Sequence, residues 1–242
     1  MVSVNRVYEK VLALANKEQR GYITPQEFNL FADMAQMEIF EQYFYDLEQR
    51  QRGTGNQFDY ADISENIQQK IYQFQITDAS AGVMAEGKAS LSPDVYRLGA
   101  VRVQYKGKNK VIAEEIQGHE SIIFSTQTNS TTSATHIFPH YIRVGSNIQI
   151  HPHPDALVGD MVFVDYISKP QKPNWTYITV ANRGSALYNP GADDHKDFSI
   201  HASEENKLVI KILQFAGVVL KDNTLLQAAA SKEIMKEQQE KQ

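Results

Sequence analysis

The sequence predicts an α+β fold in which N- and C-terminal helices form a bundle, with a β-rich, sandwich- or barrel-like domain inserted between them. Two observations lead to this fold class. Up to about residue 80, and again after about residue 200, apolar residues recur every three or four positions, as on one face of a helix. Between these limits they gather in short runs rich in Val, Ile, Tyr and Phe, which is typical of strands. The expected domains are a helical bundle of 1–80 with 200–242, and a β-rich insertion of 81–199.

Three helices are expected in the N-terminal part. The first covers 3–15, where apolar residues follow a helical spacing. The second starts at a capping box, in which Thr24 is the N-cap, Pro25 takes the first helical position and Glu27 reaches back to the cap. This helix extends to about residue 51 with a broad apolar stripe, and a third helical pattern covers 60–75.

The middle of the chain predicts strands joined by tight turns. The short apolar runs are 93–105, 110–116, 136–144, 147–151 and 161–167. Gly107-Lys108-Asn109 and Gly145-Ser146-Asn147 are expected to be hairpin turns, because Gly and Asn tolerate the positive φ that such turns require. The Ser/Thr/Asn-rich stretch 125–135 is typical of an exposed loop.

Helices are expected again at the C-terminal end. One starts at Ser203 and has a buried stripe of Leu208, Ile212, Leu213 and Phe215 before Gly217. A last helix is expected from 225 to about 239, and the stretch 232–242 forms a polar tail. A polar tail cannot bury itself in its own core, so we expect it either to fray or to bind something else.

Composition excludes several classes of protein. The chain has 242 residues with a formal net charge of −5, and 42% of its residues are hydrophobic, which is enough for a folded core. We expect neither a membrane span nor a secretory signal, because no apolar run is long enough and the first residues lack the basic-then-apolar layout. The absence of cysteine excludes disulfides, thiolate metal sites and cysteine nucleophiles. The mildly acidic balance argues against wholesale coating of nucleic acid.

Two segments invite a metal-binding hypothesis. The stretch 16–27 has the spacing of a calcium loop, but Arg20 stands where a carboxylate should coordinate. His151 and His153 have the H-x-H spacing of cupin metal sites and would share one face of a strand. The glutamate that should follow is absent, and the flanking prolines indicate a strand leaving its sheet. We therefore expect no metal and no cofactor.

Catalytic and nucleic-acid motifs are weak. The sequence has neither a G-x-S-x-G elbow nor a Gly-rich phosphate loop, so no catalytic residue is assigned and no enzymatic activity is expected. Paired carboxylates such as Glu114-Glu115 are typical of solvated surface. The one basic run places Lys106, Lys108 and Lys110 at a hairpin tip, which is either a solubilising turn or a contact to a DNA backbone.

Several stretches resemble virion structural proteins of tailed bacteriophages, particularly short-tailed crAss-like and marine phages. The likeness spans nearly the whole chain. The stretches that carry it are 5–8, 21–29, 91–98 (LSPDVYRL), 170–175 (PQKPNW), 188–190 (YNP) and, above all, 197–209 (DFSIHASEENKLV).

The resemblance implies a head-to-tail connector, an adaptor or ring protein below the portal. Such a protein forms a ring with copies of itself, often twelve-fold, that docks on the portal and on neighbouring tail or ring proteins. DNA passes through its lumen without sequence-specific binding, and the location is the virion neck or tail, after assembly in the host cytoplasm. Lys106, Lys108 and Lys110 are then candidates for contact with DNA in the lumen. The last helix and the polar tail, 225–242, supply the candidate interface residues Leu225, Leu226, Lys232, Met235, Lys236 and Gln239.

Two alternatives remain open. One is a tail accessory protein for host recognition, with the β-rich insertion as its binding surface. The other is a metal-dependent, cupin-like enzyme or sensor built on His151 and His153 or on the 16–27 loop.

Overall fold

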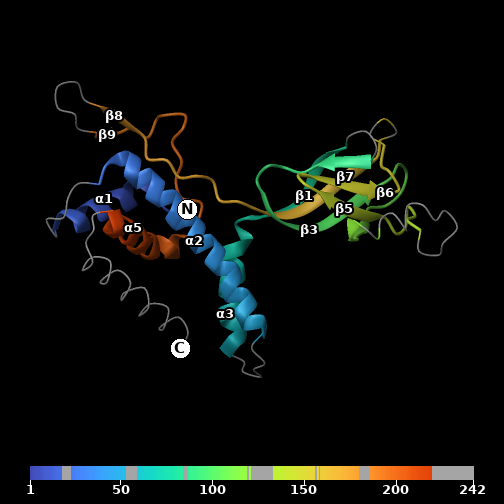
Figure 1. Cartoon of the computed structure of the whole chain (residues 1–242), viewed down its shortest axis with the longest axis horizontal. Coiled ribbons are helices and arrows are strands. Elements are labelled where there is room, and N and C mark those ends of the chain that lie inside the picture. The colour runs from blue at the N-terminus through green and yellow to red at the C-terminus, as the bar shows by residue number, and fades with distance from the viewer. Residues whose placement is uncertain are drawn as a thin grey trace. The chain divides into compact units, whose positions relative to one another are not determined.

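The computed structural model describes residues 1–17, 23–52, 59–83, 87–118, 120, 133–155, 157, 159–179 and 186–219. The fold is α+β, and the chain divides into two compact units (Figure 1). One unit comprises Met1–Gln73 with Pro170–Gln242 and holds the described helices, whereas the other comprises Phe74–Lys169 and is a closed barrel. None of the helices in the described part of the chain combines the length and apolarity needed to cross a bilayer.

The helical unit follows the predicted periodicity. Its elements are α1 (Val4–Lys17), α2 (Pro25–Arg52), α3 (Asp59–Tyr72), the 3₁₀ turn η2 (Ala202–Glu204) and α5 (Glu205–Val219). Side chains at helical spacing on α1, α2 and α5 are fully buried, among them Val7, Phe28, Ile39, Phe40, Leu208 and Ile212. Burial of these stripes against one another is the main source of stability for helices of this length.

The predicted capping box opens α2. The Thr24 hydroxyl accepts from the Glu27 backbone N–H at 3.3 Å, and the Glu27 carboxylate accepts from the Thr24 backbone N–H at 3.0 Å. The Thr24 hydroxyl also donates to this carboxylate at 2.8 Å. These hydrogen bonds, the backbone one first, hold the pKa of Glu27 below its ordinary value. Both the helix start and its cap are therefore confirmed.

Ion pairs join α5 to the N-terminal helices. Lys211 on α5 donates to Glu38 on α2 at 2.7 Å, and the Lys211 side chain is only 8% exposed. At the start of α5, Glu205 pairs with Lys10 on α1. A charged ammonium at such a buried position requires a paired anion, so these contacts specify where α5 lies against α1 and α2.

The barrel unit closes a seven-stranded sheet. Its strands follow the order β1-β2-β6-β5-β4-β3-β7, and β7 pairs back with β1. Every pair is antiparallel except β4 with β5, where Glu114 lies opposite His140 in a short parallel ladder. The bounds are β1 (Gln75–Val83), β2 (Lys88–Ser90), β3 (Val95–Gln104), β4 (Val111–Glu115), β5 (His140–Val144), β6 (Asn147–His151) and β7 (Met161–Ser168).

The barrel interior is filled by alternate residues of its strands. In β6, Ile148 and Ile150 are buried while their neighbours are half-buried, and β7 buries Val162 and Val164 in the same way. This alternation follows from the pleat, which points successive side chains to opposite faces. The two predicted turns are also confirmed, since Gly107 and Gly145 have φ of 72° and 61° and join antiparallel strands.

Some strands were not expected from the sequence. The third helix was predicted to extend to 75, but α3 ends at Tyr72 and Gln75 already begins β1. The strand β1 reads QITDASAGV, with small and polar residues and mostly exposed side chains, so it has no apolar alternation to signal it. It forms because β7 and β2 supply its hydrogen-bonding partners on both sides.

The domain boundaries differ from those predicted. The predicted insertion of 81–199 included the chain after Pro170, but this stretch belongs to the helical unit, and the barrel ends at Lys169. The physical reason is Trp175, which is 4% exposed and packs on Tyr8 of α1 with ring centroids 4.3 Å apart. The two-stranded hairpin β8 (Tyr177–Thr179) and β9 (Ala186–Tyr188) belongs to this same stretch.

The C-terminal prediction is corrected at one point. Gly217 was expected to follow the helix that starts near Ser203, but it is buried inside α5, which continues to Val219. Residues 125–132 of the predicted loop lie outside the described residues. So do the whole of the predicted 225–239 helix and the polar tail.

Candidate functional site

The predicted DNA-contacting lysines follow β3 and differ in their surroundings. Lys106 and Lys108 are exposed, and neither forms an ion pair within the described part of the chain. Lys110 instead bonds both carboxylate oxygens of Asp78, at 2.6 and 2.8 Å, and its ammonium lies 3.5 Å from the centroid of the Phe163 ring. Lys110 is thus engaged within its own barrel, and only Lys106 and Lys108 present unpaired charge outward.

The Asp78–Lys110 pair belongs to a structural network at a β-bulge. Asp78 has a φ of 58°, and the register of β1 against β7 shifts between Ile76 and Ala79. The backbone N–H of Asp78 donates to Asp165 at 2.7 Å, and Arg102 pairs with Asp165 as well. The hydrogen bond from Lys110 lowers the pKa of Asp78 below its ordinary value. The network therefore stabilises the bulge, which a residue with positive φ would otherwise strain.

His151 and His153 lie together where β6 ends. Their ring centroids are 4.7 Å apart, and His153 Nδ1 is 3.0 Å from the Ile150 carbonyl oxygen. Burial, reinforced by the neighbouring His153 and His140, lowers the pKa of His151. Among the described residues, no three His, Asp or Glu side chains are placed so that they could hold a metal ion.

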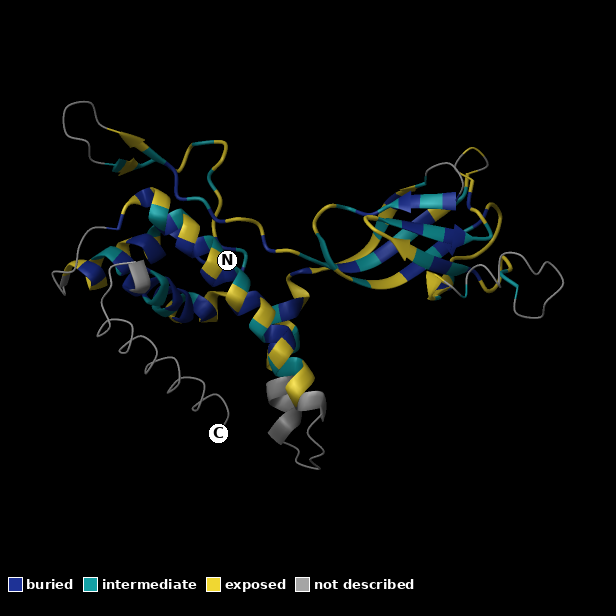
Figure 2. Cartoon of the chain, in the orientation of Figure 1, coloured by how far each residue is buried: buried dark blue, intermediate teal, exposed yellow. Residues whose placement is uncertain are grey.

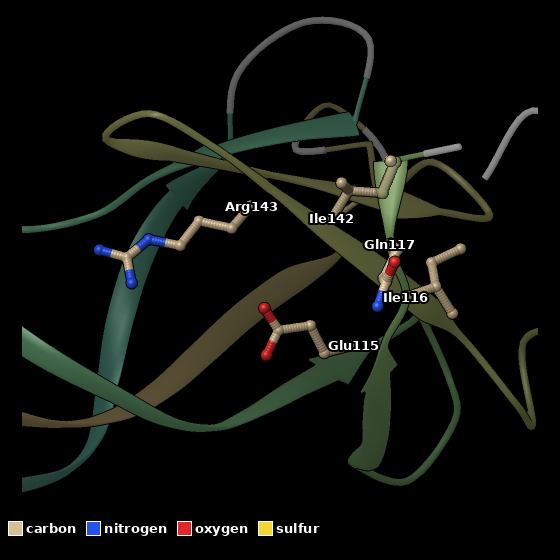
Figure 3. A pocket seen from close by; sticks show the side chains of 6 residues that line it. Glu115, Ile116, Gln117, Ile142 and Arg143 are labelled. Atoms are coloured by element: carbon tan, nitrogen blue, oxygen red, sulfur yellow. The ribbon is translucent and has the colours of Figure 1, made fainter. Parts of the chain in front are cut away.

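A hollow of about 510 Å³ lies at the junction of β4 and β5. It is lined by Glu115, Ile116, Gln117, Gly118, Ile142 and Arg143. β4 ends at Glu115, although the Ile116 N–H still donates to the Tyr141 carbonyl at 3.0 Å, whereas β5 continues to Val144. In Figure 3 the charged groups of Glu115 and Arg143 lie to one side of the hollow, and Ile116 and Ile142 line the other.

Glu115 has a partner in the barrel wall. The Tyr141 hydroxyl donates to the Glu115 carboxylate at 3.2 Å. Burial, together with this carboxylate, raises the pKa of Tyr141 to about 12. Glu115 was predicted to be solvated surface. It is exposed but lines the hollow, which sequence reasoning missed because a parallel pairing of distant segments creates it.

An aromatic cluster holds the β8–β9 hairpin on the helical unit. Trp175 stacks on both Tyr177 and Tyr188, with ring centroids 5.7 Å apart in each case. The Trp175 indole N–H donates to Asn5 on α1 at 2.9 Å, and the Tyr188 hydroxyl lies 3.3 Å from His195 Nε2. Burial, together with the nearby Asp197 carboxylate, raises the pKa of Tyr188. The hairpin is therefore fixed at its base, where both tyrosines meet the tryptophan.

The helical unit also presents apolar side chains to solvent. Ile178 and Leu187 lie directly opposite each other on the hairpin and are 54% and 61% exposed. On α2, Leu30 and Met34 are 55% and 46% exposed, although the opposite side of this helix is buried. Figure 2 shows exposed positions on the hairpin and at intervals along α2. We refer to Ile178 and Leu187 as the hairpin pair, and to Leu30 and Met34 as the α2 stripe.

The barrel has an exposed apolar surface of its own. Ile112 on β4 and Phe138 before β5 are each 70% exposed, and Ile137 is 66% exposed. Ile137 and Phe138 directly precede β5, which pairs in parallel with the end of β4, the strand that carries Ile112. We refer to these three residues as the barrel patch.

The predicted interface residues of the tail cannot be placed. Leu225, Leu226, Lys232, Met235, Lys236 and Gln239 lie outside the described residues, as do residues 18–22 of the predicted calcium loop. Comparison with protein-family models and with curated proteins finds no match to this chain.

Proposed function

We propose that this chain is a structural virion protein of a tailed bacteriophage, a subunit of the head-to-tail connector ring. In this role it bridges the portal and the tail and lines the passage through which DNA moves. It acts by binding copies of itself and neighbouring virion proteins, without a cofactor and without converting a substrate.

One structural observation supports this proposal together with the resemblance to phage proteins. The helical unit exposes two separate apolar surfaces, the hairpin pair and the α2 stripe. Neighbouring exposed apolar side chains are candidate sites of protein association. A subunit with two different adhesive surfaces is what a ring requires, because each copy must contact a neighbour on either side.

The two units then have separate roles. Helices α1, α2 and α5 form one bundle that carries the contacts between subunits, and the polar tail with Leu225, Leu226, Lys232, Met235, Lys236 and Gln239 docks on the portal or on a neighbouring ring. The unpaired ammonium groups of Lys106 and Lys108 face the DNA backbone in the lumen, where a few cations attract DNA without reading its sequence.

The test is localisation in purified particles. Antibody labelling or cryo-electron microscopy is expected to place the chain at the neck, in several copies around the axis of the tail. Its absence from the neck would overturn the proposal. Removal of 232–242 is expected to leave the thermal unfolding of the chain unchanged and to weaken its incorporation into particles.

A second candidate function is favoured by the barrel patch. Ile112, Ile137 and Phe138 are exposed together on the barrel, as expected for a recognition surface of a tail accessory protein. Replacing Phe138 with Ser distinguishes the two functions. A loss of host adsorption with normal neck assembly supports the accessory role, whereas normal adsorption argues against it.

A further inference from the structure

The β8–β9 hairpin has an apolar side that nothing in the described part of the chain covers. Tyr177 and Tyr188 face each other across the hairpin and stack on Trp175, which makes their side the inner one. Ile178 and Leu187 are one position further along each strand and so point to the opposite side. Each keeps more than half of its surface exposed.

A two-stranded hairpin needs a partner for such a face. Isolated hairpins are marginally stable in water, and they gain stability when an apolar face packs against a helix or a further strand. The inner side of this hairpin meets that need through Trp175, which itself packs on Tyr8 of α1. The outer side has no such partner among the described residues, so it is free to bind a second surface.

The same chain displays a suitable helix face. Leu30 and Met34 are four residues apart, so their side chains lie on one face of α2, and about half of each is exposed. Since α2 also buries Phe28, Ala32 and Ala35 in its own core, this outer stripe is additional to the packing that holds the subunit together.

The two segments carry formal charges of opposite sign, although Asp33 already pairs with Lys172 and Glu38 with Lys211. The part of α2 that spans 25–49 contains neither lysine nor arginine, and its charged residues are Glu27, Asp33, Glu38, Glu41, Asp46 and Glu48. In sequence, the hairpin segment 175–191 contains no acidic residue and no lysine, and its one charged residue, Arg183, lies outside the described residues. Two acidic helices would repel each other, whereas an acid-free hairpin can approach this helix without that cost.

We infer that the hairpin pair of one copy docks on the α2 stripe of the next copy. The hairpin cannot make this contact within its own subunit, because its outer side points away from the helices on which its inner side rests. The contact is heterologous, since it joins two different surfaces, and repeating it produces a ring when the rotation between copies closes. This inference rests on the proposed connector function and names the surfaces through which the ring forms.

The test uses two double variants of the full chain, each altered on one surface. Ile178→Thr with Leu187→Thr changes the hairpin and places a good strand former at both positions, whereas Leu30→Gln with Met34→Gln changes α2 and keeps good helix formers. Ile112→Thr on the barrel is the matched control, because it also replaces an exposed β-strand apolar residue. The fluorescence of Trp175 and far-ultraviolet circular dichroism verify that each variant is folded.

Sedimentation velocity over a range of concentrations measures association. We expect the unaltered chain and the Ile112→Thr control to self-associate. In each double variant we expect the dissociation constant of self-association to rise by at least about tenfold. Mixing the two double variants is the decisive step. One retains an intact stripe and the other an intact hairpin, so they are expected to form a one-to-one complex that grows no further.

Several results would overturn the inference. If either double variant still associates as the unaltered chain does, its surface is not the contact. If the mixture yields no one-to-one complex, the two surfaces do not bind each other. An unaltered chain that stays monomeric, or one that contacts itself only through like surfaces, also contradicts the inference. Localisation in the neck is an independent measurement, so the connector function can survive each of these failures.

Discussion

Replacing Gln36 with leucine is expected to destabilise the helical unit. Gln36 is fully buried on α2, and its side-chain amide joins two segments that are distant in sequence. Its Nε2 donates to the Gln171 carbonyl at 2.8 Å, and its Oε1 accepts from the Ser199 backbone N–H, also at 2.8 Å. Leucine keeps most of the volume but leaves both backbone groups without this partner.

The magnitude follows from these two hydrogen bonds. A buried backbone group without a partner costs about 1–3 kcal/mol. Gln171 is exposed, so its carbonyl can bind water, whereas the Ser199 N–H is half-buried and loses more. We therefore expect the free energy of unfolding to fall by about 2 kcal/mol, which corresponds to roughly 4–8 °C in Tm for a chain of this size.

The single tryptophan supplies the assay. Trp175 is buried in the aromatic cluster, so its fluorescence in a urea titration reports the unfolding of the helical unit separately from the barrel. Gln49→Leu is the matched control on the same helix, because Gln49 is exposed and its loss should change stability by no more than about 0.5 kcal/mol. If the free energy of unfolding of Gln36→Leu also changes by no more than about 0.5 kcal/mol, the buried amide does not hold the two segments together.

A second substitution tests the direction of each hydrogen bond. Gln36→Glu keeps an acceptor for the Ser199 N–H but, when ionised, has no donor for the Gln171 carbonyl. Burial raises the pKa of such a carboxyl, and its protonated form regains a donor. The loss of unfolding free energy in this variant, relative to the unaltered chain, is expected to be larger at pH 7 than at about pH 4.5. An equal deficit at both pH values would contradict this account.

Three further predictions concern the barrel. Gly87→Ala is expected to lower the stability of the barrel by at least about 1 kcal/mol, because Gly87 has a φ of 70° and a Cβ there would lie 2.9 Å from the Cα of His153. Thermal unfolding measures this loss, and an unchanged Tm would contradict the prediction. The pKa of His151 is lowered in the folded state, so the unfolded chain takes up the proton first as the pH falls. The stability of the barrel is therefore expected to fall as the pH drops through about 6.5. Hydrogen exchange of barrel amides should show this loss of stability, and the loss should be smaller in His151→Gln. Lys110→Ala is expected to raise the pKa of Asp78 towards its ordinary value, as measured by an NMR titration of the carboxyl, and an unchanged pKa would show that Lys110 does not hold it down.

Local signals in the sequence predicted much of the secondary structure. Thr24, Pro25 and Glu27 form their capping box within four residues, so the start of α2 depends on no distant partner. The turns at Gly107 and Gly145 likewise follow from the positive φ that glycine permits. The helix periods and the apolar alternation of β6 and β7 are properties of short stretches, and they determined the α+β class.

The tertiary structure alone decided where distant segments meet. The strand β1 has no apolar alternation and exists because β2 and β7 bond to it, and the hollow beside Glu115 exists because β4 and β5 pair in parallel. The stretch after Pro170 joins the helices through Trp175 and Gln36, whose partners lie more than a hundred residues away. Such contacts depend on which surfaces are free once each unit has folded, and that information is not contained in any short stretch of sequence.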